Sequence, residues 1–357
     1  MKYPLIIFCF FLFSCSQIEN IIKVQYTPSS GVELLSSSVF EEIEIVKLYE
    51  KMLPFGSRLV VKNESYYIAG DDEVHLFDAT GKHIANVGVK GRGPAEYTSI
   101  DGMIIEDNGD ISIYSKVGTL YTYSRQGRFL GSNEYQVSSR EFARINGFNY
   151  HFFGNGKGRP YQLYISDNQN YIIDSCIAAI NATTFILGSV FSEYGNALIL
   201  CPSDDGNIYR LTDGEVHLSY KFNFGMYHIP DEYYRCRNVD ETFNLVLSNT
   251  IAFKCMFLEN QKYAFLETCV FDGKQESERM LYGILEKATS TWKWYFMNDG
   301  DFLNSYNLKY LDDSYLYFIV YPDLMKDASI AEYFPILGTL DEECTMVILK
   351  CKLAQSS

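Results

Sequence analysis

The sequence predicts an all-β fold, and more narrowly a six-bladed β-propeller, on three observations. From residue 40 onward, short runs rich in β-branched and aromatic residues alternate with turns of Gly, Asp and Asn. The segments 74–84 (VHLFDATGKHI) and 120–130 (LYTYSRQGRFL) superpose at an offset of 46 residues, and each has the pattern strand, glycine turn, strand. A repeat period in the forties is typical of the four-stranded blades of a propeller.

The N-terminus has the pattern of a signal peptide over residues 1–14, with Lys2 before an apolar run that is too short to span a bilayer as a mature helix. The run ends in LFSC at 12–15, which resembles the lipobox of bacterial lipoproteins, whose cysteine is acylated and becomes the new N-terminus. We therefore expect lipidation at Cys15, a tether over residues 15–39, and a location in the cell envelope, at the outer membrane. An ordinary signal peptide with an incidental cysteine is the alternative.

The repeat places the innermost strands of six blades along the chain, near residues 58, 103, 144, 185, 251 and 306. The last blade has only three strands of its own, at 306–312, 314–321 and 346–353. The run 40–49, apolar at alternate positions, is predicted to be its fourth strand. Pairing of this strand beside 346–353 closes the ring and leaves no free sheet edge.

Two stretches interrupt the repeat, near 226–249, which includes a short helical pattern, and near 323–343. Neither stretch is long enough to form a hydrophobic core of its own. We therefore expect one propeller domain over residues 40–357 that carries both stretches as insertions.

Composition and charge limit the classes of partner. The chain has 357 residues, of which 47% are hydrophobic, enough for a large core. The 30 Lys+Arg against 45 Asp+Glu give a formal net charge of −15, so the chain lacks the positive field on which binding to nucleic acid depends. Nucleic acid is therefore not an expected partner, and contact with the bacterial membrane is expected through the lipid anchor alone.

Three segments resemble the opening blades of the six-bladed β-propeller lipoproteins of Bacteroidetes, relatives of the NHL-repeat propellers. They are 40–45 (FEEIEI), 74–82 (VHLFDATGK) and 87–97 (VGVKGRGPAEY), and the element GxGPxEY is the most specific part. The resemblance covers about residues 40–135 and is only architectural beyond, and Ala95 stands where a glycine is more usual. It implies an envelope-anchored propeller and carries over no catalytic residue.

Two basic loops are candidates for an anion or partner site. Successive strands of a blade are antiparallel, so strand parity places the loops 90–93 (KGRG) and 157–160 (KGRP) on one face, together with acidic loops at 71–73, 204–205 and 298–301. The side chains of Lys90, Arg92, Lys157 and Arg159, with flexible glycine amides, suit a carboxylate, sulfate or phosphate. In the alternative, the glycines shape the crossover and the basic side chains are solvated or pair with nearby carboxylates.

The first insertion is a second candidate surface, because aromatic and charged side chains alternate within it. Tyr227, Tyr233, Tyr234 and Arg235 form the mixture found at carbohydrate and protein contact surfaces. In the alternative, the insertion packs back on the rim of blade four.

Patterns typical of metal, cofactor or acyl-transfer chemistry are missing from the sequence. It has no C-x-x-C pair, no twelve-residue calcium loop, no metal spacing among its five histidines and no G-x-S-x-G element. We therefore predict no cofactor, no metal and no catalytic residue. The pairs Cys255–Cys269 and Cys344–Cys351 are candidate disulfides, and buried thiols are the alternative.

These observations favour a lipoprotein of the cell envelope that acts as a non-enzymatic binding or scaffolding propeller for a protein or glycan partner. The alternative is a metal-dependent, lactonase-like hydrolase or lyase with an active site on the propeller axis. Such an enzyme needs inward Glu, Asn and Asp from several blades. The predicted innermost strands, around residues such as Val60, Ile104 and Phe253, contain few carboxylates.

Overall fold

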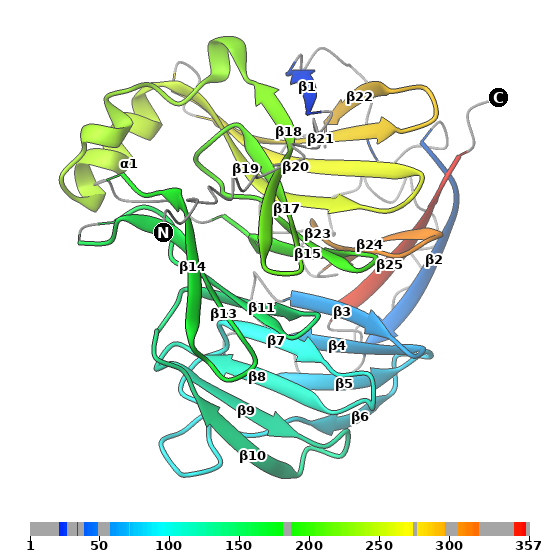
Figure 1. Cartoon of the computed structure of the whole chain (residues 1–357). Helices are drawn as coiled ribbons and strands as arrows, with labels where there is room; N and C mark the ends of the chain where they lie inside the picture. The colour runs from blue at the N-terminus through cyan, green and yellow to red at the C-terminus, as the bar shows by residue number, and fades with distance from the viewer. Residues whose placement is uncertain are drawn as a thin grey trace, which may run out of the picture.

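The computed structural model describes residues 21–26, 34, 39–48, 58–70, 72–156, 158–180, 187–273, 277–296, 306–320 and 346–354. These residues form six sheets arranged as the blades of a propeller, which confirms the predicted fold (Figure 1). Innermost strands of neighbouring blades contact one another around the axis, and the outermost strands lie at the periphery.

Blades one to three are each a meander of four consecutive strands that runs from the axis outward. In chain order these strands are β3 (Arg58–Lys62), β4 (Ser65–Ala69), β5 (Val74–Asp78), β6 (His83–Asn86), β7 (Gly102–Ile105), β8 (Ile111–Ser115), β9 (Thr119–Tyr123), β10 (Phe129–Glu134), β11 (Glu141–Ile145), β12 (Phe148–Phe152), β13 (Tyr161–Ser166) and β14 (Ile172–Ala178).

Blades four and five repeat the meander with longer strands in blade five. Their strands are β15 (Phe191–Tyr194), β16 (Ala197–Leu200), β17 (Asn207–Thr212), β18 (Glu215–Asn223), β19 (Thr250–Glu259), β20 (Tyr263–Asp272), β21 (Ser277–Glu286) and β22 (Thr291–Phe296). The innermost strand of blade four begins at Phe191, six residues after the predicted position at Phe185. The prediction was early because blade four lacks a clean turn repeat from which to measure.

The repeated glycine turn has a physical reason in the structure. Gly81 and Gly127, in the turns between the third and fourth strands of blades one and two, have φ of +85° and +78°. A Cβ on Gly81 would lie 2.2 Å from the carbonyl oxygen of Lys47, and one on Gly127 would lie 2.3 Å from that of Asn86. Each turn thus touches the outermost strand of the preceding blade, and only glycine allows both the positive φ and the close approach.

Blade six closes the ring as predicted. Its strands are β23 (Tyr306–Leu311), β24 (Tyr315–Val320), β25 (Met346–Leu353) and the N-terminal β2 (Phe40–Leu48), which is outermost. β2 pairs antiparallel with β25, with Ile45 opposite Leu349, and the ion pair between Glu44 and Lys350 spans the same two strands. The edge of β25 is therefore covered by the start of the chain.

An additional strand, β1 (Ile22–Gln25), lies within the segment predicted as a tether. It pairs in parallel with β18, so that blade four has five strands. Val24 and Tyr26, two residues apart, both face the blade and are buried. The Tyr26 ring centroid lies 4.6 Å from that of Trp294 in blade five, and its hydroxyl is 3.0 Å from Oγ1 of Thr268. This part of the predicted tether therefore belongs to the fold, because its apolar side chains fill the junction of blades four and five.

The first insertion follows blade four and contains two 3-10 turns, η1 (Gly225–Tyr227) and η2 (Tyr233–Arg235), and one helix, α1 (Val239–Ser248). Asn238 caps α1, since its side chain accepts a hydrogen bond of 2.9 Å from the backbone N–H of Glu241. Among the described residues no helix has the length and apolar character needed to cross a bilayer. The predicted insertion at 323–343 lies outside the described residues.

Candidate functional site

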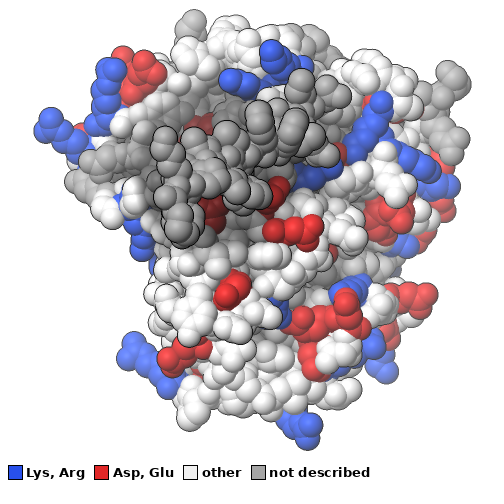
Figure 2. Space-filling view, in the orientation of Figure 1, with Lys and Arg blue, Asp and Glu red and all other residues white. Residues whose placement is uncertain are grey.

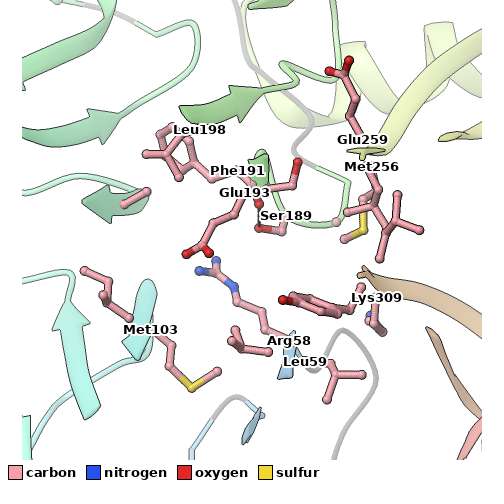
Figure 3. Close-up of a pocket in the computed structure, with 18 of the residues that line it drawn as sticks. Arg58, Leu59, Met103, Ser189, Phe191, Glu193, Leu198, Met256, Glu259 and Lys309 are labelled. Atoms are coloured by element: carbon pink, nitrogen blue, oxygen red, sulfur yellow. Dashed lines mark hydrogen bonds between the residues drawn. The ribbon is translucent and has the colours of Figure 1, made fainter. Parts of the chain in front are cut away.

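Residues from all six innermost strands enclose a cavity of about 250 Å³ on the propeller axis. Figure 3 shows Arg58, Glu193 and Lys309 in the wall of this axial cavity. The apolar part of the wall includes Leu59, Met103, Phe142, Leu198, Met256 and Leu258. A small number of polar groups in a mostly apolar concave wall is the usual composition of a ligand site.

Two arginines of the wall hold carboxylates. Nη2 of Arg58 in blade one lies 2.7 Å from Oε1 of Glu141 in blade three, and Arg144 in blade three forms an ion pair with Glu106, which follows the innermost strand of blade two. Burial raises the pKa of Glu141, and the Arg58 charge opposes this shift. Both carboxylates are therefore engaged with guanidinium groups, and the pairs link the innermost strands of three blades.

Lys309 has a different setting from the two arginines. It is the extra residue of a β-bulge in β23, where Leu308 pairs with Phe318 and Tyr310 with Tyr317, and a bulge redirects the side chain it carries. Burial lowers the pKa of Lys309 to about 8, an effect that the charge of Glu267 opposes and the charge of Arg58 supports. Within the described part of the chain, no carboxylate forms an ion pair with Lys309.

Glu193 is the second charged group of the wall that has no ion-pair partner among the described residues. Its side chain is accessible to solvent inside the cavity, and the other residues of the cavity wall surround it. The surrounding protein raises the pKa of its carboxyl group, and the Lys62 charge opposes this shift. Perturbed titrating groups in a cavity indicate a functional site when geometry supports it.

The axial cavity continues into a groove of about 580 Å³, which we call the cavity-mouth groove. It lies at the loops that join the first and second strands of blades four, five and six, at 195–196, 260–261 and 312–313. The cavity and the groove share Glu193, Glu259, Tyr310 and Leu311 in their linings. A continuous hollow therefore leads from the propeller axis to this face, which we call the hairpin face.

Glu259 lies where the cavity, the cavity-mouth groove and a further groove of about 470 Å³ between blades four and five meet. Its buried carboxylate is 3.1 Å from Nη2 of Arg210 and 2.6 Å from Nζ of Lys287, and it accepts a hydrogen bond of 2.9 Å from the hydroxyl of Tyr220. Both cations also lie over the ring of Tyr194, at 4.7 and 4.6 Å from its centroid. This cluster fixes the edge of the groove in place.

The predicted basic loops lie on one face, as strand parity requires. The strand order of blade three is as predicted. The loop 153–160 and the crossover 87–101 therefore both lie on the face opposite to the hairpin face. Lys90 forms an ion pair with Asp72, and the guanidinium of Arg159 lies 4.0 Å from the ring centroid of Phe153. Lys157 lies outside the described residues. Lys90 and Arg159 therefore already have partners within the chain.

In the GxGPxEY element, a backbone amide that could bind an external anion donates instead to a carboxylate of the element itself. The backbone N–H of Gly93 donates a hydrogen bond of 2.8 Å to Oε2 of Glu96, and a Cβ on Gly91 would lie 1.9 Å from the same oxygen. Tyr97 is fully buried and donates from its hydroxyl to the carbonyl oxygen of Asp72 at 3.3 Å. The glycines are thus needed for the packing of Glu96, while Arg92 stays exposed.

On the face of the molecule that Figure 2 shows, acidic and basic side chains of the described residues are interspersed, without an extended basic patch.

The aromatic side chains that were predicted to form a partner surface on the insertion mostly contact other residues of the protein. Tyr233 is fully buried, and Tyr234 donates a hydrogen bond of 2.6 Å to the backbone carbonyl of Asp204. The ring centroid of Tyr227 lies 5.7 Å from that of Tyr26, and Arg235 is exposed. The exposed large apolar side chains of this insertion are Met226 in η1 and, on α1, Val239, Phe243 and Leu247.

Three of the four cysteines in the candidate disulfides lie in the described part of the chain. Cys255, Cys269 and Cys351 are buried thiols, so the candidate disulfide between Cys255 and Cys269 is wrong and the alternative of core thiols holds for this pair. Cys344 and Cys15 lie outside the described residues. In the described ranges, no group of three or more His, Cys, Asp or Glu side chains is placed to share a metal ion.

The charged groups of the axial cavity are the functional candidates that sequence reasoning missed. In the sequence, the innermost strands are identified by their apolar residues and are predicted to carry few carboxylates, but no role is assigned to their basic residues. The available signal was the presence of single charged residues in otherwise apolar strands, such as Arg58 in RLVVK and Lys309 in YNLKYL. Such a residue on an innermost strand points either to the axis or between blades, and only the structure distinguishes the two.

One solved structure shares the fold of this chain, and two others are similar to it to a lesser degree. A protein from Bacteroides fragilis NCTC 9343 described as exported is 16% identical, with a TM-score of 0.78 over 93% of this chain and 100% of that chain. BamB from Moraxella catarrhalis is 10% identical, with a TM-score of 0.37 over 78% of this chain and 86% of that chain. The Pan2 WD40 domain from Neurospora crassa is 8% identical, with a TM-score of 0.40 over 82% of this chain and 88% of that chain.

No curated protein matches the sequence. A family model does match, over residues 19–350, and this range includes β1, blades one to five and blade six as far as the middle of β25. The family is described as Domain of unknown function (DUF4934). Because the match spans most of the sequence, the chain belongs to the DUF4934 family.

Proposed function

We propose that this chain is a lipid-anchored protein of the bacterial cell envelope that binds a protein or glycan partner without catalysis, through the axial cavity and the cavity-mouth groove. The LFSC motif at Cys15 supports the anchor, at the outer membrane, and the likeness to an exported Bacteroides fragilis protein supports export. The single observation that carries the binding function is the continuous hollow from the axis to the hairpin face.

The arrangement of charges supports binding over hydrolysis. A metal-dependent, lactonase-like site needs several carboxylates that converge on one point and are not held by cations. Here Glu141, Glu106 and Glu259 are each paired with Arg or Lys side chains from other strands or turns. Fixed, paired charges around an apolar cavity suit recognition of a ligand in a defined orientation.

Site-specific photocrosslinking in intact cells tests this proposal. A photoreactive amino acid at Asn196, in the cavity-mouth groove, is expected to crosslink to an envelope protein or glycan. The same amino acid at Val117, an exposed residue of the opposite face, serves as the control and is expected to give little product. Equal crosslinking at both positions, or none at Asn196, would contradict the proposal.

The predicted basic loops provide a competing location for the same function. Replacing Lys90, Arg92, Lys157 and Arg159 together by Gln is expected to leave crosslinking from Asn196 unchanged, since two of these side chains already have partners in the chain. A strong loss of crosslinking in this variant would move the site to the loop face.

A further inference from the structure

We propose that the axial cavity binds a carboxylate carried on an apolar body, and that the ammonium group of Lys309 is the ion-pair partner of that carboxylate. This inference rests on the proposed binding function and names the chemistry of the group that enters the cavity.

The position of Lys309 orients the ligand. Lys309 lines the axial cavity but not the cavity-mouth groove, whereas Glu193 lines both. Lys309 is therefore the deeper group, beside Arg58, and Glu193 lies at the junction with the groove. Because Glu193 repels an anion, a ligand carboxylate is stable at the inner end, at Lys309.

The charges around Lys309 leave a place for an anion. Arg58 holds Glu141 and Arg144 holds Glu106, so the two guanidinium groups are compensated. Lys309 forms no such pair with the described residues, although the field of Glu267 reaches it. A buried ammonium without a counter-ion is unfavourable, and an entering carboxylate would complete the pair in a cavity of low polarity.

The rest of the wall selects the body of the ligand. Met103, Phe142, Met256 and Leu258 belong to three different blades and surround the cavity with aliphatic, thioether and aromatic groups. The volume of about 250 Å³ is near the lower end of small-molecule sites, which span roughly 300–1,000 Å³. The cavity therefore fits a single branched aliphatic or aromatic group next to the carboxylate.

Two sources supply this chemistry, namely the C-terminal residue of a partner polypeptide and a free organic acid. The cavity-mouth groove, at about 580 Å³, has room for the chain that precedes a C-terminal residue. A free acid would use the cavity and leave the groove empty.

Calorimetric titration of the full propeller at pH 7 tests the proposal with matched probes. N-acetyl-L-leucine and hexanoate carry a carboxylate on an apolar body, and N-acetyl-L-leucinamide and hexanamide are their neutral counterparts. We expect both acids to bind at least about tenfold more tightly than their amides, the ratio that one charge-assisted contact provides. Equal affinity of acid and amide, or no binding of either acid, would overturn the inference. This test needs only the unchanged protein.

A peptide with a free C-terminal leucine distinguishes the two sources. If it binds more tightly than N-acetyl-L-leucine, contacts in the groove contribute and a chain terminus is the ligand. If it binds no more tightly, a free acid is the ligand. Either result is compatible with a carboxylate at Lys309.

The variant Lys309→Met removes the charge and keeps a side chain of similar length. We expect it to lose about tenfold or more in affinity for both acids and to keep its weak affinity for the amides, while Lys82→Met, in an exposed turn, binds as the unchanged protein does. Undiminished acid binding by Lys309→Met would refute the assignment. Acid binding without crosslinking at Asn196 would contradict the proposed function alone, and crosslinking without acid binding would contradict this inference alone.

Discussion

Nη2 of Arg58 lies 2.7 Å from Oε1 of Glu141, so an ion pair joins the innermost strands of blades one and three, which are not neighbours in the ring. The side chain of Glu141 is 7% exposed and that of Arg58 is 24% exposed. Because the link does not pass through the sheet of blade two, it restrains the spacing of blades around the axis independently of the closure in blade six.

Removal of one partner of this pair should destabilise the protein strongly. Arg58→Met leaves the carboxylate of Glu141 buried without a counter-ion and is expected to lower the free energy of unfolding by about 3 kcal/mol at pH 8. Burial already raises the pKa of Glu141, so the variant regains stability as pH falls and the group takes up a proton. Urea unfolding at pH 5 and pH 8 measures both effects.

Two matched variants complete the test. The double substitution Arg58→Met with Glu141→Gln should cost less than Arg58→Met alone, since no unpaired charge is left. Arg128→Met, on an exposed arginine, should change stability by less than about 0.5 kcal/mol. If Arg58→Met were as stable as the unchanged protein at pH 8, the pair would have no structural role.

The strand β1 should contribute to stability although it precedes the ring. A chain that starts at residue 27 lacks the buried side chains of Val24 and Tyr26 and should melt earlier than one that starts at residue 16. Tyr26→Ala alone is expected to cost about 3 kcal/mol, because it leaves a cavity beside Trp294. Calorimetric melting of these proteins checks the expectation, with Tyr171→Ala, an exposed tyrosine, as the control.

A chain that starts at residue 51 should behave still worse, since it also lacks β2 and exposes the edge of β25 to aggregation. Identical melting of the chains that start at 16 and 27 would show that β1 adds nothing to the fold.

Asp204 should give the protein a stability that depends on pH. Burial raises the pKa of this carboxyl from 3.8 to about 6, partly offset by a hydrogen bond from Asn155. A raised pKa means that the folded state binds the proton more tightly, so this contribution is fully present below pH 3.8 and is lost as pH rises to about 6.

Asp204→Asn carries no charge at any pH, so its stability relative to the unchanged protein should increase across this window and level off above it. The total gain should be about 3 kcal/mol, the value that corresponds to such a shift. Urea unfolding from pH 4.5 to pH 8 measures the slope, and Asp231→Asn, on an exposed carboxylate, should show none. A difference that does not vary with pH would show that Asp204 titrates as an ordinary carboxyl group.

The proposed anchor depends on one sulfur atom. Cys15→Ala should abolish labelling by radioactive palmitate and move the protein from the membrane fraction to the soluble periplasm. Cys9→Ala, within the predicted signal peptide, should leave both properties unchanged because Cys9 is removed with the signal. Retention of the Cys15→Ala protein in membranes would exclude the lipid anchor.

The architecture was predictable because its signals are local. The glycine turns at Gly81 and Gly127 repeat visibly, and the alternation of apolar residues in 40–48 identifies a strand that needs a partner. The strand β1 was missed because a run of four residues after a predicted signal peptide gives no periodicity to measure, and its burial depends on Trp294, far along the chain.

The site was less predictable than the fold for a related reason. Whether a charge on an innermost strand faces the axis depends on strand register and on bulges, and the bulge that carries Lys309 has no signature in YNLKYL. Composition identifies the basic loops, but it does not show that the carboxylate of Glu96 accepts the hydrogen bond of the Gly93 N–H or that Asp72 pairs with Lys90.

The pairing of β2 with β25 also governs the order in which the protein can fold. Ile45 and its partner Leu349 are separated by most of the chain, so the last sheet cannot form until the C-terminal strand has been made and reaches β2. Contacts between such distant residues are slow to form, because a long loop must close before they contribute any stability. Throughout that interval β2 lacks its partner and presents an unpaired edge, which makes ring closure the step at which aggregation competes with folding.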